Sequence, residues 1–138
     1  MAPSADRFPR SLKSPEGPVS VIDGAHMERV VEASRKSPRG RIILPSHKTD
    51  DDNCHRMLNA LQPGSYIRPH RHLSPPKAET ILVLKGSICF VIFDTGGAID
   101  NHFILAFGSS RIGIDIEPII YHTLFALEND TVIFEVKE

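Results

Sequence analysis

Two histidines separated by one residue, His70 and His72, are the side chains of this sequence best suited to chemistry. Alternate side chains of a β-strand point to the same face, so the two imidazoles would project in one direction. Glu79 follows after a short loop, and His122 lies in a later predicted strand. Imidazole and carboxylate groups are common ligands of first-row divalent metals. The four residues therefore predict a site for one divalent ion, and zinc, nickel, manganese and iron all suit this ligand set.

A second interpretation of the same residues needs no metal. The chain contains seven histidines, so an HxH triplet can arise by chance. A histidine that shares a face with apolar neighbours, as His122 does, is often a hydrogen-bonded core residue. The combination favours the metal, because HxH, a downstream glutamate, a hairpin glycine and a later histidine all fall on predicted strands of one small domain.

Other polar side chains near the HxH triplet are candidates for catalysis and ligand binding. If the strand is regular, Tyr66 and Arg68 share the face of the two histidines, whereas Arg71 faces away. Tyr66 is a candidate acid or base, and Arg68 is a candidate anchor for a carboxylate or phosphate on a ligand. His47 borders a strand that could reach the mouth of a barrel, and Tyr121 directly precedes the last candidate metal ligand. Both are further candidates for ligand binding.

The composition is that of one globular domain. The chain has 138 residues, of which 41% are hydrophobic and 24% charged, with a formal net charge of −1. Such a chain can bury a core of its own, and its charge gives no reason to expect nucleic acid or a membrane as a partner. No apolar run approaches the roughly 20 residues that span a bilayer, and no secretory signal is expected. Cys54 and Cys89 are too far apart for a CxxC motif and are expected to be reduced thiols of a cytoplasmic protein.

Proline spacing and hydrophobic periodicity divide the chain into a tail and one domain. Residues 1–18 contain four prolines and no hydrophobic period, which predicts a disordered tail. Residues 19–138 form the predicted domain, with a short amphipathic helix at about 24–36 that Asp23 caps. The predicted strands that follow are 41–47, 55–61, the HxH segment, 79–85, 87–94, 98–106, 111–116, 121–127 and 131–137. Short strands at regular spacing predict an all-β fold, either a small antiparallel barrel or a double-sheet jelly roll.

The predicted strand from Ile88 to Phe93 is apolar on both faces. One face can line the interior, and the other face must be covered as well. The second sheet or the N-terminal helix is one possible cover, and a second copy of the chain in a homodimer is another. The sequence leaves both open.

At these residues the chain resembles the cupin superfamily. The first cupin motif is matched by Gly64, His70, His72, Glu79 and Gly86, although six residues separate His72 from Glu79 where the pattern has three or four. The second motif is matched in part, by Gly113, Pro118 and His122, with Ile120 near the expected glycine and Ala126 in place of asparagine. The resemblance implies a cupin jelly roll in which the three histidines and Glu79 bind the metal.

A narrower resemblance is to the WbuC family of cupin-fold metalloproteins. It is carried by residues 37–39, 55–66 and 68–72 and by the ending Phe134-Glu135-Val136-Lys137. The longer loop before the glutamate is normal in that family, which supports Glu79 as a ligand. This sequence departs from it in the apolar residues before His47 and in Tyr121, where tryptophan often stands. The family is associated with gene clusters for surface polysaccharides, and its reaction is unassigned.

These observations predict a metal-dependent protein that takes a small-molecule ligand. Three histidines and a carboxylate leave one or two positions open on a six-coordinate ion, so Lewis-acid chemistry is available. A sugar isomerase or epimerase fits this site and the gene-cluster association, and an oxygenase fits if the metal is iron. A non-catalytic module that binds or senses a small molecule through the metal fits as well, because the cupin barrel carries many functions.

Overall fold

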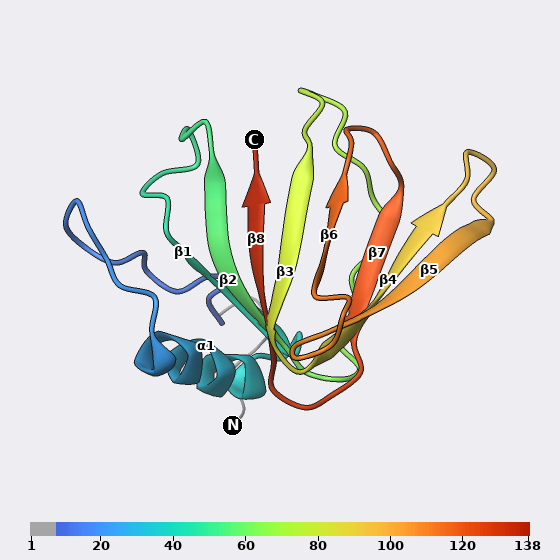
Figure 1. The fold of residues 1–138 in the computed structure, drawn as a ribbon. Coiled ribbons are helices and arrows are strands. Elements are labelled where there is room, and N and C mark those ends of the chain that lie inside the picture. The colour runs from blue at the N-terminus through green and yellow to red at the C-terminus, as the bar shows by residue number, and fades with distance from the viewer. Residues whose placement is uncertain (1–7) are drawn as a thin grey trace.

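Alternating apolar residues build two antiparallel β-sheets that face each other, with one helix outside them (Figure 1). The computed structural model describes residues 8–138. Its elements are α1 (Gly24–Lys36), β1 (Arg41–Pro45), β2 (His55–Leu61), β3 (Glu79–Lys85), β4 (Ser87–Phe93), β5 (Ile99–Ala106), β6 (Gly113–Ile116), β7 (His122–Ala126) and β8 (Thr131–Lys137). The larger sheet has the order β1-β2-β8-β3-β6, and the smaller has the order β5-β4-β7. The predicted all-β fold is therefore confirmed in its double-sheet form, since hydrogen bonds do not close the two sheets into one barrel.

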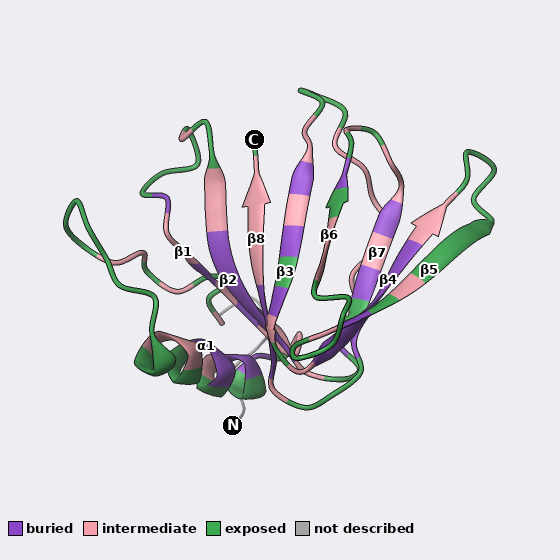
Figure 2. Cartoon of the chain, in the orientation of Figure 1, coloured by how far each residue is buried: buried purple, intermediate pink, exposed green. Residues whose placement is uncertain are grey.

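The core lies between the sheets and is made by every second residue of the facing strands. Ile81 and Ile133 come from the large sheet, and Ile88 and Phe90 come from the small one, each at most 1% exposed. Figure 2 shows this period as alternating buried and accessible bands on β3 and β7. One face of each sheet is therefore apolar, as expected for strands that pack on one side.

Helix α1 covers the outer face of the large sheet near β1, β2 and β8. The Asp23 carboxylate accepts a hydrogen bond from the backbone N–H of His26 at 3.1 Å and so caps the first turn. Val30, Val31 and Ser34 form its buried face. The helix predicted at about 24–36 is confirmed. It forms there because the capping residue Asp23 and the helical spacing of the apolar residues favour the same segment.

The chain before α1 was expected to be a disordered tail over residues 1–18. Residues 1–7 lie outside the described residues. In the part that follows, the backbone N–H of Leu12 donates to the carbonyl of Ile43 at 2.8 Å, and Phe8 and Leu12 pack against the core beneath α1. These contacts hold part of the expected tail against the large sheet, and the division into tail and domain stays a prediction.

Gly86 joins β3 to β4 and meets a backbone requirement that only glycine satisfies easily. Its φ is +76°, and a Cβ atom at this position would lie 2.4 Å from Oγ1 of Thr131. Both the left-handed conformation and the close approach exclude a side chain. The glycine of the first cupin motif therefore has a structural reason in this chain.

The outer face of β4 is not covered by α1, which packs on the other sheet. Cys89 and Val91 on this face are nevertheless buried. Cys89 is flanked by Ile104 of β5 and Phe125 of β7, which are 48% and 41% exposed. Neighbouring strands therefore shield the β4 residues, and the predicted homodimer stays a prediction.

Candidate metal centre

The segment between β2 and β3 carries His70 and His72, and it is not a strand. Its backbone pairs with β7 at one position, where the N–H groups of His70 and His122 donate to each other's carbonyls at 3.0 and 2.9 Å. Three residues earlier, the carbonyl of Ile67 accepts a hydrogen bond from the Thr123 hydroxyl and not from a backbone N–H. The prediction that the HxH triplet lies on a β-strand is wrong. The single bridge still places His70 directly beside His122.

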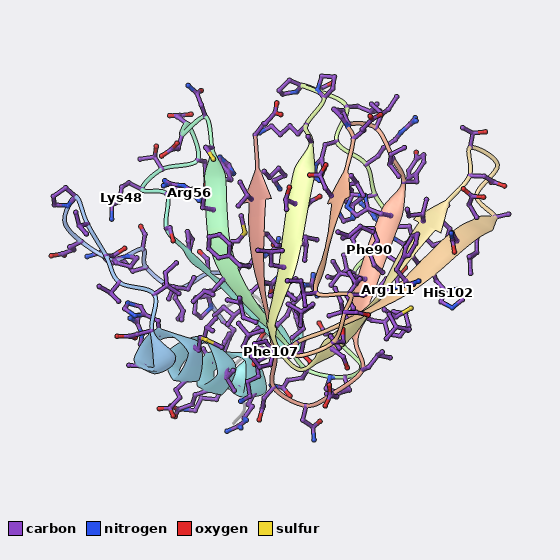
Figure 3. The ribbon with its side chains drawn as sticks, in the orientation of Figure 1. Lys48, Arg56, Phe90, His102, Phe107 and Arg111 are labelled. Carbon is purple, nitrogen blue, oxygen red and sulfur yellow. The ribbon has the colours of Figure 1, made fainter. Side chains whose placement is uncertain are left out.

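Two of the three histidines have their tautomer fixed by the backbone. Nδ1 of His70 lies 2.9 Å from the carbonyl of Arg68, and Nδ1 of His122 lies 2.8 Å from the carbonyl of Ile120. A carbonyl only accepts, so each Nδ1 carries a proton and each neutral ring presents the lone pair of Nε2. Phe90, which projects from β4 between the sheets (Figure 3), stacks on the His122 ring with centroids 5.4 Å apart.

The ring nitrogens converge with a carboxylate. Ligand atoms of His70, His72 and His122 all lie within 4.8 Å of one another. Oε2 of Glu79, the first residue of β3, lies 3.2 Å from Nε2 of His122 and 3.4 Å from Nε2 of His72. The four predicted ligands therefore come together from three parts of the chain.

These atoms need a cation between them. The backbone contact of His122 leaves a lone pair on Nε2, and this lone pair faces a carboxylate oxygen, which repels it unless a proton or a metal ion intervenes. Nε2 of His72 and Oε2 of Glu79 are buried and have no hydrogen-bond partner. Buried polar atoms without partners are costly, and coordination to a divalent ion would satisfy both. The residues present therefore fit one divalent metal ion.

The charge states suit metal binding at neutral pH. Burial lowers the pKa of His70 and of His72, which keeps both rings neutral and able to coordinate. Burial works against the carboxylate form of Glu79, but the neighbouring His122 outweighs it and lowers the pKa of Glu79. Burial likewise opposes a charged His122, but Glu79 and the Ile120 carbonyl raise its pKa, so a proton can occupy this position when no metal does.

The predicted orientation of the residues around the triplet is wrong. Tyr66 is 71% exposed and Arg68 is also exposed, because Ile67 between them packs into the core. Arg71 is half-buried, with its guanidinium carbon 4.4 Å from the ring centroid of Tyr121. The alternation is lost between Ile67 and the histidines because this stretch is not held in a strand ladder, so Arg71 rather than Arg68 lies beside the site.

His47 and Tyr121 are in different surroundings. His47 is buried just after β1, where its Nδ1 accepts a hydrogen bond from the backbone N–H of Arg56 at 3.0 Å. Its ring stacks on that of His55, with centroids 4.3 Å apart. The structure does not group His47 with the three converging histidines. Tyr121 is the stacking partner of Arg71, and a role of either residue in ligand binding stays a prediction.

Comparison with known families and structures begins with a match over residues 22–105, well over half of the chain, to the model described as "Domain of unknown function (DUF6016)". The chain belongs to the DUF6016 family. The matched part of this DUF6016 protein runs from α1 into β5 and includes His70, His72 and Glu79, whereas His122 lies after it. The comparison with curated proteins found no match.

Solved structures similar to the DUF6016 chain have the cupin fold. KdgF from Halomonas sp. is 18% identical with a TM-score of 0.52, over 70% of this chain and 74% of that one. Oxalate oxidase in complex with the substrate analogue glycolate is 19% identical with a TM-score of 0.53, over 73% and 51%. Bacillus subtilis oxalate decarboxylase, a protein with Mn(II) centres, is 22% identical with a TM-score of 0.51, over 64% and 22%.

The DUF6016 chain thus spans about half the length of that oxalate oxidase and less than a quarter of the oxalate decarboxylase. At such identities the likeness establishes the fold alone. The expected cupin architecture is confirmed, and membership of the WbuC family stays a prediction. In the described part of the chain, no helix is both long and apolar enough to cross a membrane.

Two charged residues of β8 near the candidate ligands were not predicted. Glu135 and Lys137 share the inward face of β8 with Ile133, and Lys137 lies in register with Glu79. Nδ2 of Asn59 lies 3.5 Å from the Glu135 carboxylate. Burial, with the charge of Glu79, raises the pKa of Glu135 to about 7. The sequence could have indicated this position. Glu135 and Lys137 lie two and four residues after Ile133 on a predicted strand, so all three side chains point to the same face.

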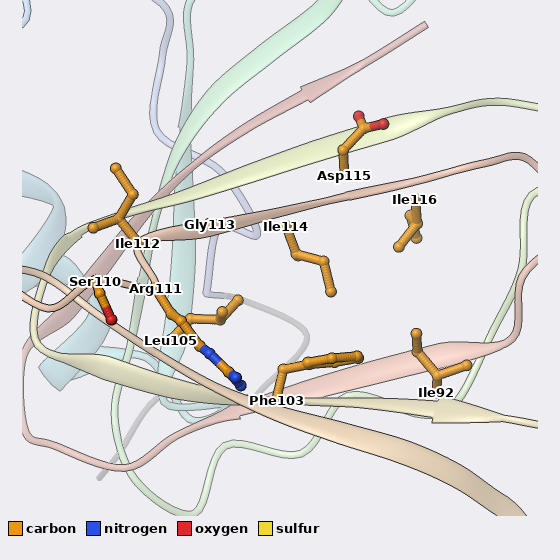
Figure 4. A pocket seen from close by; sticks show the side chains of 10 residues that line it. All are labelled: Ile92, Phe103, Leu105, Ser110, Arg111, Ile112, Gly113, Ile114, Asp115 and Ile116. Carbon is orange, nitrogen blue, oxygen red and sulfur yellow. The ribbon is translucent and has the colours of Figure 1, made fainter.

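Two of the cavities near the candidate ligands differ in character. One is an apolar cleft of about 630 Å³ between β6 and the small sheet (Figure 4). Its walls include Ile116, in register with Glu79, and Ile92, in register with His122. The other cavity, of about 290 Å³, contains His72 in its wall. The inward face of the DUF6016 fold thus offers an apolar and a polar approach near the same four residues.

Proposed function

We propose that this protein binds one divalent metal ion through His70, His72, Glu79 and His122 and uses it to bind and transform a small anionic ligand. The observation that carries the proposal is the approach of Nε2 of His122 to Oε2 of the buried Glu79 carboxylate at 3.2 Å, beside the unpartnered Nε2 of His72. A closed structural site would use all its positions on protein ligands. On a six-coordinate ion, three histidines and one carboxylate leave positions free for a substrate oxygen.

A bound divalent ion would supply Lewis-acid polarisation of a carbonyl or hydroxyl oxygen. The chain itself supplies a proton carrier near this position. Glu135 lies on the inward face of β8 near Glu79, and burial with the charge of Glu79 raises its pKa to about 7 while no metal ion is bound. A divalent ion beside Glu79 would lower this pKa and make Glu135 a carboxylate that accepts a proton. Tyr66, the acid or base predicted from the sequence, points to solvent, so Glu135 takes its place in the proposal.

The substrate class rests on resemblance. We propose an isomerase or epimerase acting on a sugar-derived molecule of surface-polysaccharide synthesis, on the basis of the likeness to the WbuC family.

The proposal extends to a cytoplasmic homodimer that buries the outer face of β4, where the neighbouring Ile104 and Phe125 are partly exposed. Sedimentation velocity tests the dimer, and a monomer at every concentration would contradict it.

The metal is tested first. Elemental analysis of the purified protein should give about one divalent ion per chain. The double substitution His70→Ala and His72→Ala should abolish it, whereas His102→Ala should leave it unchanged, because His102 is exposed on the outer side of β5 (Figure 3). Stoichiometric metal in the double variant would refute the proposed ligands.

Catalysis is tested second. Metal-loaded protein is incubated with a panel of sugar phosphates and nucleotide sugars, and the products are read by mass spectrometry and proton exchange by NMR. Turnover should disappear on chelation, return with added metal and fall at least tenfold in Glu135→Gln. Binding without turnover across the panel would identify a sensing module, and dioxygen consumption by the iron form would identify an oxygenase.

A further inference from the structure

The smaller cavity beside the candidate ligands is unusually basic. The residues that line it are His55, Arg71, His72, Leu73, Ser74, Pro75, Lys77 and Lys137. Three are permanent cations at neutral pH, and no carboxylate lines the cavity among the residues that the structure describes. Arg71 and Lys77 come from the segment between the His70 bridge and β3, and Lys137 comes from the end of β8.

The protein neutralises these cations only in part, since Lys137 lies in register with Glu79 and its charge acts on Glu79 and Glu135. Within residues 8–138, none of Arg71, Lys77 and Lys137 forms an ion pair with a carboxylate. Nε of Arg71 is buried and has no hydrogen-bond partner. Like charges gathered around one cavity repel each other, so an anion in the cavity would relieve this repulsion.

Arg71 is held in position for such an anion. Its guanidinium carbon lies 4.4 Å from the ring centroid of Tyr121, and Tyr121 directly precedes the candidate ligand His122. Stacking on an aromatic ring orders the planar group and leaves its edge free to donate, which suits bidentate binding of an oxyanion.

The cavity shares a wall with the candidate metal centre. His72 belongs to both, and the charge of Lys137 acts with burial to lower the pKa of His72. The volume of about 290 Å³ is below that of most drug-sized sites, which suits a compact anionic group and the first atoms attached to it. A ligand held here by its anionic end would reach His72 with its next few atoms.

We infer that this basic cavity binds the phosphate group of a small phosphate monoester, with Arg71 as its main anchor and Lys77 and Lys137 beside it. The inference rests on the proposed metal function, whose ligand it places in a phosphorylated class. A phosphate monoester carries close to two negative charges and three acceptor oxygens, which matches three cations better than one carboxylate does.

The experiment measures binding of inorganic phosphate, glycerol 3-phosphate and malonate by isothermal titration calorimetry at fixed ionic strength. Glycerol 3-phosphate should bind more tightly than malonate. Arg71→Ala should weaken it about tenfold or more, and Lys137→Gln should weaken it severalfold. Arg68→Ala is the matched control, since it removes an exposed arginine three positions away and should change affinity less than twofold.

Equal weakening by the Arg68 and Arg71 substitutions would overturn the inference, as would tighter binding of malonate or no binding of either phosphate. Circular dichroism checks that each variant is folded. If Arg71→Ala does not fold, the affinity of Lys137→Gln for glycerol 3-phosphate tests the inference in its place. Metal content is measured on the same samples. Stoichiometric metal without phosphate binding refutes the basic cavity alone, whereas phosphate binding that depends on Arg71 in protein unable to hold metal refutes the metal function alone.

Discussion

Substituting Glu79 by glutamine removes one charge from the candidate centre while keeping the size of the side chain. A ligand that binds only the folded state at one hundred times its Kd stabilises it by about 2.7 kcal/mol. Unfolding entropy is about 2.1 cal/mol/K per residue, or about 0.29 kcal/mol/K for 138 residues. The divalent ion should therefore raise the Tm of the wild-type protein by about 9 °C over the chelated form.

The same concentration of metal should raise the Tm of the Glu79→Gln variant far less. Glu79 is only 7% exposed and contacts two of the histidines. Loss of a group that merely supports a ligand weakens metal binding up to about a hundredfold, so we expect loss of this ligand to weaken it by at least about that factor. The ion is then at or below its Kd, and the stabilisation falls to about 0.4 kcal/mol or less, which is no more than about 2 °C.

The assay is differential scanning calorimetry with Zn²⁺, Ni²⁺, Mn²⁺ and Fe²⁺ added in turn to chelator-stripped protein. Glu117→Gln removes an exposed carboxylate from the loop before β7 and should respond like the wild type. If every ion raises the Tm of Glu79→Gln as much as that of the wild type, Glu79 is not a ligand and the reasoning from its unpartnered oxygen fails.

Three further predictions concern the scaffold. Arg35 lowers the pKa of Asp130 to about 2 from 3.8, so Asp130 contributes stability that is complete above pH 4 and is lost as the pH falls through 2. Asp130→Asn should therefore cost about 1 kcal/mol at pH 7, after allowance for solvent screening, and almost nothing at pH 2 in urea unfolding; equal costs at both would contradict this. Gly86→Ala should destabilise by more than 1 kcal/mol because of its positive φ and the approach of Thr131, and an unchanged urea midpoint would rule that out. Phe90→Ala should cost about 3 to 5 kcal/mol in the same assay, since Phe90 is fully buried, and a loss below 1 kcal/mol would show that the core collapses around the gap.

The strands were predictable because apolar and polar residues alternate along them and turn residues mark their ends. β2, β3 and β8 have the predicted bounds, and α1 follows from Asp23 and the apolar spacing after it. The convergence of the candidate ligands was expected from the resemblance to the cupin motifs, and the structure achieves it through the isolated bridge between His70 and His122.

The orientation of the residues around the triplet was not predictable in the same way. A two-residue period holds only while a strand is paired, and this segment pairs with β7 at His70 alone. Whether Arg68 or Arg71 faces the site therefore depends on contacts with distant residues, namely the packing of Ile67 in the core and the stacking of Arg71 on Tyr121. The inward orientation of Glu135 could have been predicted from the period of its strand. Its position near Glu79 depends on the pairing of β3 with β8, which the sequence does not specify.

The rings of His70 and His122 are each held by a main-chain carbonyl two residues earlier, that of Arg68 and that of Ile120. Many metal proteins give this task to a neighbouring carboxylate side chain, which a single mutation can delete. Here the group that aims the imidazole is present whatever amino acid occupies the position. Side chains at 68 and 120 are thus free to vary during evolution without turning either ring. The geometry of the two rings can in this way be inherited intact while these side chains change.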